Sequence, residues 1–275
     1  MKRLTFCLTL AMLLMTGCKH QAKEFNTHTI SGERCWLQLF DEPFIFDMDT
    51  LGVVVTYSFE WPDKGMISPE AERELQYLCF GDSSAADVET ALQNWLKQPF
   101  FFEEECASQQ PVESIDDRIG CSLFDISSSC NREGNLATFN IWTEITPFVA
   151  AHGVYSGNNL IVDLETGKAI HLEDLVTDTN LLCEAIAHAI QDLEVNNGII
   201  ECLFDEFKDA DRMPMPHNFV IDSAMNGITV FYGLYEITPY ACGIQEVELP
   251  IFWLSKHVPL TPYAKKLFGP ESYIE

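Results

Sequence analysis

The chain has 275 residues and a formal net charge of −26, because it contains 42 acidic and 16 basic residues. Such an acidic surface repels the phosphates of nucleic acids, so no nucleic-acid partner is expected. It would attract a basic protein or metal ions, although a high charge also serves plain solubility. The length leaves room for one large domain or two small ones.

The first seventeen residues predict an export signal. Lys2 and Arg3 give a positive start, residues 4–15 form an apolar run, and Thr16-Gly17 places small residues before Cys18. A run of this length is too short to span a bilayer, which favours a signal peptide over a membrane helix. The segment ending at Cys18 fits a lipobox, in which the cysteine thiol is alkylated by diacylglycerol. The alternative is ordinary cleavage that leaves Cys18 free.

Removal of residues 1–17 leaves 275 − 17 = 258 residues with a net charge of 14 − 42 = −28, since the signal contains two basic residues and no acid. No later segment has 18 uninterrupted apolar residues, so the lipid on Cys18 would be the membrane anchor. We therefore expect a lipoprotein of the bacterial cell envelope that faces the periplasm or the cell surface.

Cysteines of the exported part predict at least one disulfide, because their number is even and the compartment is oxidising. No C-x-x-C pair occurs, so neither a zinc ribbon nor a thioredoxin-like motif is expected. The alternative is that several are small buried apolar residues. The eight are Cys35, Cys79, Cys106, Cys121, Cys130, Cys183, Cys202 and Cys242.

Residues 18–30 are polar and aperiodic, which predicts a tether between the lipid and the folded part. The remainder divides into an N-terminal half, 31–146, and a C-terminal half, 147–275. A run rich in Val, Tyr and Phe predicts a strand over residues 51–61.

Two helices are expected next. Ser68-Pro69-Glu70 begins the first with a capping side chain, a first-turn proline and an acid, and Gly81 ends it. The second starts at Ser84 as a capping box with Asp87, and Pro99 ends it. Residues 103–117 are acidic and irregular, which predicts a surface loop. The second helix has one apolar stripe: Val88, Ala91, Leu92, Trp95 and Leu96.

Later segments are mostly strands. Residues 137–146 form one, and residues 160–164 and 169–172 form a hairpin around Gly167. A third helix has apolar residues between Leu182 and Leu193 and ends at Asn196-Asn197-Gly198, and a shorter helical stretch is expected near 201–207. The closing strands are residues 219–222, 228–237 and 246–254. We expect their core to consist of Ile228, Val230, Phe231, Val247, Leu249 and Ile251.

Strands dominate late and helices come in pairs, without strict βαβ alternation. The predicted fold class is therefore α+β, a largely antiparallel sheet or sheets with paired helices packed on them, in two intimately associated halves.

Two motifs in the second half resemble RsiV-like envelope domains. Residues 163–168 (DLETGK) and 172–175 (LEDL) match a "D-x-x-T-G-K … L-x-D-L" hairpin. Residues 218–221 (NFVI), 227–231 (GITVF) and 235–243 (YEITPYACG) match a second signature, and the resemblance covers about residues 50 to 257. Such domains form the outer part of lysozyme-sensing anti-sigma factors, precede the catalytic domain of PdaC-type peptidoglycan deacetylases, and occur as stand-alone lipoproteins.

One turn departs from the resemblance. Many RsiV-like domains have "Y-x-G-G-A-H" before the hairpin, whereas this chain has Val149 and Ala150 in place of the glycines. His152 carries over and is a candidate for a binding contact. Tyr235, Glu236 and Tyr240, which surround a tight corner at Pro239, are further candidates, although a structural role is the alternative for all four.

No motif predicts catalysis. The sequence has no G-x-S-x-G, no H-E-x-x-H and no paired-histidine motif of the kind that a PdaC-type deacetylase needs. Its acidic runs lack the spacing of a calcium loop, so no metal or other cofactor is expected. We expect a non-catalytic binding module whose partner is a cationic wall-active protein such as lysozyme, or cell-wall glycan. The alternative is a hydrolase that acts on cell-wall glycan or peptide through carboxylates that the spacing does not single out.

Overall fold

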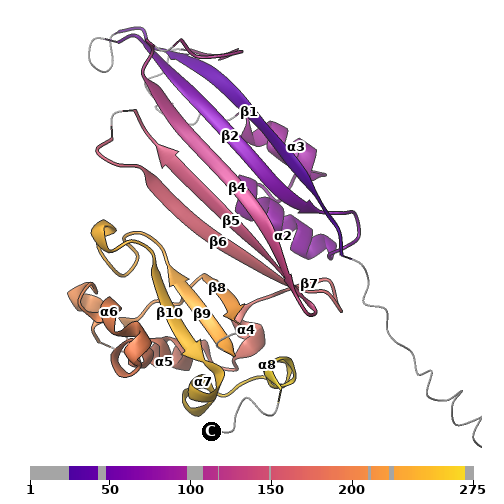
Figure 1. Cartoon of the computed structure of the whole chain (residues 1–275), viewed down its shortest axis with the longest axis vertical. Coiled ribbons are helices and arrows are strands. Elements are labelled where there is room, and N and C mark those ends of the chain that lie inside the picture. The colour runs from indigo at the N-terminus through magenta and orange to yellow at the C-terminus, as the bar shows by residue number, and fades with distance from the viewer. Residues whose placement is uncertain are drawn as a thin grey trace, which may run out of the picture.

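The computed structural model describes residues 25–42, 48–97, 108–116, 118–148, 150–209, 212–222 and 226–269. The predicted α+β class is confirmed. A seven-stranded sheet has the order β3-β1-β2-β4-β5-β6-β7, and a three-stranded sheet has the order β10-β9-β8 (Figure 1). The strands of the large sheet are β1 (Thr27–Leu39), β2 (Thr50–Pro62), β3 (Ser108–Val112), β4 (Cys121–Glu133), β5 (Leu136–Thr146), β6 (Val154–Asp163) and β7 (Lys168–Ile170).

The large sheet is antiparallel except where β2 pairs with β4. A parallel pair needs a long crossover connection, and here it contains α2 (Pro69–Phe80) and α3 (Val88–Trp95). These helices lie on one face of the sheet (Figure 1). Every second residue of β2 faces them and is buried, among them Val53, Val55 and Phe59. The sequence run over 51–61 is therefore a strand, as predicted.

Both helices begin at capping side chains. Ser68 Oγ accepts the amide hydrogen of Ala71 at 3.2 Å, and Gly81 ends α2 at φ 69°, as predicted. The predicted start of α3 at Ser84 is wrong. Asp87 caps that helix by accepting from the Thr90 amide at 2.8 Å, while Ser84 bonds to Asp82 at 2.6 Å in the preceding turn.

A second lobe follows the large sheet. Its three strands carry α5 and α7, and buried aliphatic residues such as Leu182, Ile186 and Leu249 fill the space between them. The elements are α4 (Leu172–Leu175), α5 (Thr179–Asp192), η1 (Glu194–Asn196), α6 (Asn197–Ile200), η2 (Asp205–Phe207), β8 (Asn218–Asp222), β9 (Gly227–Tyr232), η4 (Tyr240–Cys242), β10 (Gln245–Pro250), α7 (Ile251–His257) and α8 (Pro262–Phe268).

Strand β6 belongs to both cores. Leu160 and Val162 face the helices of the large sheet, whereas Ile161 faces the second lobe. The side chain of Asn218 on β8 completes the junction, because it accepts from the Asn159 amide at 2.9 Å and donates to the Gly157 carbonyl at 2.8 Å. The Asn218 side chain thus forms hydrogen bonds with the β6 backbone and joins the two sheets at this point.

Several predicted boundaries are wrong. β1 was not expected, and its start at Thr27 lies within the predicted tether. Part of the predicted loop 103–117 is strand β3, which forms because it pairs with β1. Strand β4 was also not expected. α5 ends at Asp192, and residues 194–200 continue as η1 and α6 where a stop was predicted.

The closing strands are shorter than expected. β9 ends at Tyr232, where a turn begins, and β10 ends at Pro250, where α7 begins, so Ile251 is buried on a helix. Phe231 is half-buried on the opposite face from Ile228 and Val230, because strand side chains alternate. None of the described helices has the length and hydrophobicity needed to cross a bilayer.

The predicted disulfide is confirmed: Cys202 is bonded to Cys242. Cys35 and Cys79 are buried and free, and burial raises the pKa of the Cys79 thiol well above its ordinary value. These two cysteines therefore act as small buried apolar residues, which was the alternative to a disulfide. Cys18 and Cys106 lie outside the described residues.

Leu249→Ala should lower the free energy of unfolding by about 2–5 kcal/mol, because Leu249 is fully buried against the α5 and α7 side. Phe231→Ala should cost clearly less, since Phe231 keeps part of its surface in solvent. Urea unfolding measures both values. Equal losses at the two positions would contradict the placement of Phe231 on the less buried face of the small sheet.

Candidate functional site

The loop after β9, residues 233–243, has a tightly bonded backbone. Glu236 accepts the Gly233 amide hydrogen at 2.7 Å through its carboxylate, and its own amide donates to the Gly233 carbonyl at 3.2 Å. Between them Tyr235 has φ 64°, a conformation that L residues rarely adopt. The loop therefore presents Tyr235 outward at 58% exposure, while Glu236 closes the turn. A strained residue that the surroundings hold in place is a common feature of binding sites.

The far end of this loop is tied down twice. The disulfide joins Cys242 to Cys202 of the segment after α6. The Gln245 side chain donates to the carbonyls of Cys242 and Gly243 at 2.7 and 3.1 Å. Both restraints act next to Tyr240, the first residue of η4, and so limit where its ring can lie.

Five aromatic side chains meet where this loop approaches β5 and β6, and we call them the aromatic surface. Tyr240 stacks on His152 with centroids 3.9 Å apart and lies 5.8 Å from Tyr235 and 6.3 Å from Tyr155. Tyr155 in turn stacks on Trp142 at 5.4 Å. Tyr240 is thus the centre, and its hydroxyl donates to the Gly153 carbonyl at 2.8 Å. This bond links the second lobe to the large sheet.

Three of the four predicted binding residues, His152, Tyr235 and Tyr240, are therefore brought together although up to 88 positions separate them. Glu236 is not part of the surface, because its carboxylate serves the turn. The turn at Val149-Ala150 includes Val149, which lies outside the described residues.

Sequence reasoning missed Trp142 and Tyr155. A signal for Trp142 was present: on the strand predicted over 137–146, it is in phase with Asn140 and Glu144, whereas Phe139 and Ile141 form the buried phase. A tryptophan on the polar phase of a strand is a solvent-facing aromatic, and Trp142 is 41% exposed.

Acidic side chains border the aromatic surface on the sheet face opposite α2 and α3. Glu144 is directly opposite Tyr155 on β6 and directly opposite Asp125 on β4. Both carboxylates are exposed, and Asp125 accepts from Thr56 Oγ1 at 3.0 Å. Within the described residues neither forms a salt bridge. Like charges directly across two strands repel each other, and a bound cation would relieve that repulsion.

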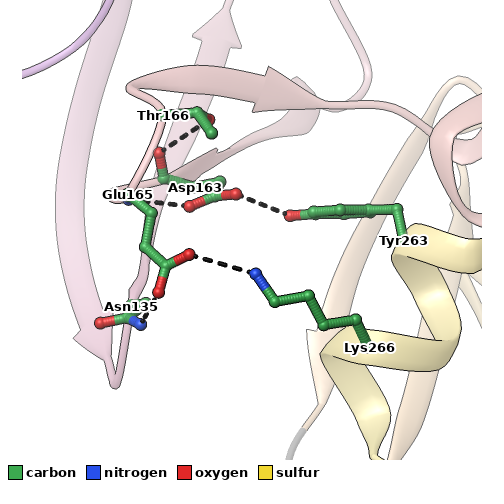
Figure 2. A network of polar contacts seen from close by, with 6 residues as sticks. All are labelled: Asn135, Asp163, Glu165, Thr166, Tyr263 and Lys266. Carbon is green, nitrogen blue, oxygen red and sulfur yellow. Dashed lines mark hydrogen bonds and ion pairs between the residues drawn. The ribbon is translucent and has the colours of Figure 1, made fainter.

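A second region lies at the other end of β6, where a pocket of about 370 Å³ opens between the two lobes. Figure 2 shows its polar side: the Tyr263 hydroxyl donates to Asp163 at 3.2 Å, and Lys266 pairs with Glu165 at 3.4 Å. Glu165 also accepts from Asn135 at 2.9 Å. Burial and the Asp163 carboxylate raise the pKa of Tyr263, so this phenol stays protonated and donates. We call this the junction pocket.

The D-x-x-T-G-K motif has a structural explanation in this pocket wall. Asp163 accepts the Glu165 amide at 2.8 Å, and Gly167 turns the chain at φ 71°. The Gly167 carbonyl then accepts the Ser68 amide at 2.6 Å, which fixes the hairpin to the start of α2. In the L-x-D-L motif, Asp174 accepts the His171 amide at 2.9 Å and so begins α4. Among the described residues, no three His, Cys, Asp or Glu side chains converge as a metal site.

Residues 173–251 match a family described as protein of unknown function (DUF3298). The match runs from α4 to the start of α7 and so includes Tyr235 and Tyr240 but not Trp142, His152 or Tyr155. It is compatible with the RsiV-like resemblance. The curated proteins include no match to this chain.

Two solved structures share the fold over nearly their whole length. A DUF3298 family member from Bacteroides fragilis NCTC 9343 is 18% identical with a TM-score of 0.55, covering 89% of this chain and 96% of that one. A DUF3298 family protein from Pseudomonas aeruginosa PAO1 is 13% identical with a TM-score of 0.52, covering 88% and 97%. At these identities the likeness concerns the fold alone.

Replacing both Cys202 and Cys242 by Ser should lower the free energy of unfolding by about 2–4 kcal/mol, because the bond closes a chain segment of 40 residues. Hydrogen exchange of the backbone amides at positions 242 and 243 should accelerate, while amides in the centre of β5 keep their protection. Unchanged exchange at positions 242 and 243 would show that the Gln245 hydrogen bonds are sufficient to hold the loop.

Proposed function

We propose that this protein is an envelope lipoprotein whose folded part is a non-catalytic binding module for a basic protein. The observation that carries the proposal is the aromatic surface. Tyr235, Trp142 and His152 are exposed there, and Tyr240 holds the cluster together from two lobes. Rigid, exposed Tyr and Trp side chains are the residues that most often dominate binding energy at protein interfaces.

The chemistry of the surroundings favours a cationic partner. Arginine and lysine side chains bind aromatic faces by cation–π attraction and pair with carboxylates. Glu144 lies directly opposite Tyr155, and Asp125 lies one strand further, opposite Glu144; both carboxylates line a pocket of about 280 Å³ between β2, β4 and β5. A basic protein can therefore place one cationic side chain against Tyr155 and Glu144 and another in this pocket.

A lysozyme-like protein is the partner that two independent arguments support. The RsiV-like resemblance suggests it, and the charge of the exported chain, 14 − 42 = −28, favours a basic ligand. Association should be steered by charge and weaken with salt, because the Debye length falls from about 30 Å at 0.01 M to about 8 Å at 0.15 M. Any acidic protein would show some salt dependence, so the test must address the aromatic residues.

Tyr235→Ala should weaken binding of lysozyme about 10- to 30-fold, as expected for an interface residue worth roughly 1.4–2 kcal/mol. Titration calorimetry measures the change. Tyr77→Ala is the matched control, since Tyr77 on α2 has 57% exposure against 58% for Tyr235 and lies outside the aromatic surface. Glu144→Gln should also weaken binding, whereas Glu89→Gln, an exposed acid on α3, should not.

A folded basic protein of charge similar to lysozyme is the comparison ligand. Equal weak binding of both proteins would reduce the interaction to non-specific electrostatics and contradict the proposal. A different outcome is that lysozyme does not bind, whereas insoluble cell-wall glycan binds and Tyr235→Ala abolishes that binding. The partner would then be the glycan and not a basic protein.

The membrane anchor is tested separately. Cys18→Ala should move the protein from the membrane fraction to the soluble fraction, because alanine has no thiol to carry the lipid and no later segment has 18 uninterrupted apolar residues. Detergent phase partitioning measures this, with Cys183→Ala as the control. A Cys18→Ala protein that still partitions with the detergent would contradict lipidation.

The hydrolase alternative gains no support from the described carboxylates. An acid catalyst is expected to be a carboxyl with a raised pKa that lies in a cleft near a second carboxylate. Burial raises the pKa of Glu74, but the side chain beside it is His171, with Nε2 at 3.5 Å, and not a second carboxylate. Asp125 and Glu144 are close together and both exposed, which suits cation binding better than proton donation.

A further inference from the structure

We propose that the junction pocket is a second binding site, and that its ligand is a small primary amine with an apolar or aromatic body. The pocket lies between the hairpin turns of the large sheet and α8 of the second lobe. Its volume of about 370 Å³ is within the range of small-molecule sites, which often lie between domains. Along β6, Asp163 and Tyr155 are eight residues apart, so about 26 Å separates the pocket from the aromatic surface.

The pocket combines an apolar floor with a polar side. Leu136 and Ile221 are half-buried parts of the second core, and Leu267 and Phe268 on α8 close the floor. Tyr263 also lines the pocket, and its hydroxyl points toward Asp163 (Figure 2). Such a floor can remove the apolar body of a ligand from water, which favours binding.

The charges in the pocket favour a cation. Three carboxylates, from Glu133, Asp163 and Glu165, line it with one ammonium group, that of Lys266. Asp163 is held in place by Tyr263 and by the hairpin backbone, so its position does not depend on a ligand. Glu165 is fixed by Asn135 and reaches toward Lys266 (Figure 2).

Lys266 occupies the position that a ligand amine would take. Its ammonium group is 3.4 Å from Glu165, and its side chain is 77% exposed. An exposed ion pair of this kind contributes little to stability, so a competing amine can displace it at small cost. An amine whose apolar body fills the floor gains burial energy that the long, solvated lysine side chain does not.

Two substitutions distinguish binding in this pocket from a general electrostatic attraction of amines to the acidic protein. Removing the internal competitor by Lys266→Met should tighten amine binding several-fold, while Glu165→Gln should weaken it about tenfold. Asp163→Asn is avoided because Asp163 also shapes the hairpin turn. Glu89→Gln on α3 removes one negative charge far from the pocket and should leave binding unchanged.

The experiment is titration calorimetry of the full chain in detergent with phenethylamine, 2-phenylethanol and 3-phenylpropionate. These probes share an aromatic body and differ in charge. We expect phenethylamine to bind and the neutral alcohol to bind at least tenfold more weakly. Tyr235→Ala should not change phenethylamine binding, so failure here and failure of the aromatic surface are distinguishable.

Three outcomes would overturn the proposal. Equal affinity for amine and alcohol would show only an apolar cavity. Preference for the carboxylate, lost in Lys266→Met, would show an anion site. Weaker amine binding by Lys266→Met, in a variant whose thermal unfolding matches that of the unchanged chain, would show that Lys266 supports the pocket and does not compete for it.

Discussion

The alternation of side chains along β6 is the constraint on which the rest of the structure depends. Because neighbouring strand residues point to opposite faces, Leu160 and Val162 enter the core beneath the helices while Ile161 enters the core of the second lobe. The second lobe can therefore dock only on one side of this strand, and a one-residue shift of β6 would place each of these side chains in the wrong core. Asn218 then fixes the position along the strand through bonds to Asn159 and Gly157.

This docking positions both candidate sites. At one end of β6, Tyr240 of the second lobe reaches the Gly153 carbonyl and lies against His152 and Tyr155. At the other end, Tyr263 of α8 reaches Asp163. Each site thus combines residues of the two lobes, and a ligand at either one would stabilise the docked arrangement by binding it in preference to separated lobes. The two sites are linked by a common interface without sharing a residue.

The two regions differ in the kind of partner that they suit. The aromatic surface includes exposed rings and borders on two exposed carboxylates, Asp125 and Glu144, that form no salt bridge with any described residue, which suits a basic protein. The junction pocket is concave and mostly apolar, and two of its carboxylates, those of Asp163 and Glu165, are held by hydrogen bonds. Preorganised groups in a concave site favour small ligands, whereas exposed aromatic groups favour a large surface.

The sequence by itself determined the local features: the Ser68 cap and Gly81 stop of α2, the β6–β7 hairpin at Gly167 and the α+β class. These depend on a few neighbouring residues, so composition and spacing suffice. Strands β1, β3 and β4 were not predicted, because they are ordered by pairing with other strands: β1 with β2 and β3, and β4 with β2 and β5. Likewise, His152, Tyr235 and Tyr240 could be named as candidates, but Trp142 and Tyr155 joined them only in the tertiary structure. Which rings meet depends on how the two lobes dock. Their residues are far apart in the sequence, so no local sequence pattern can predict these contacts.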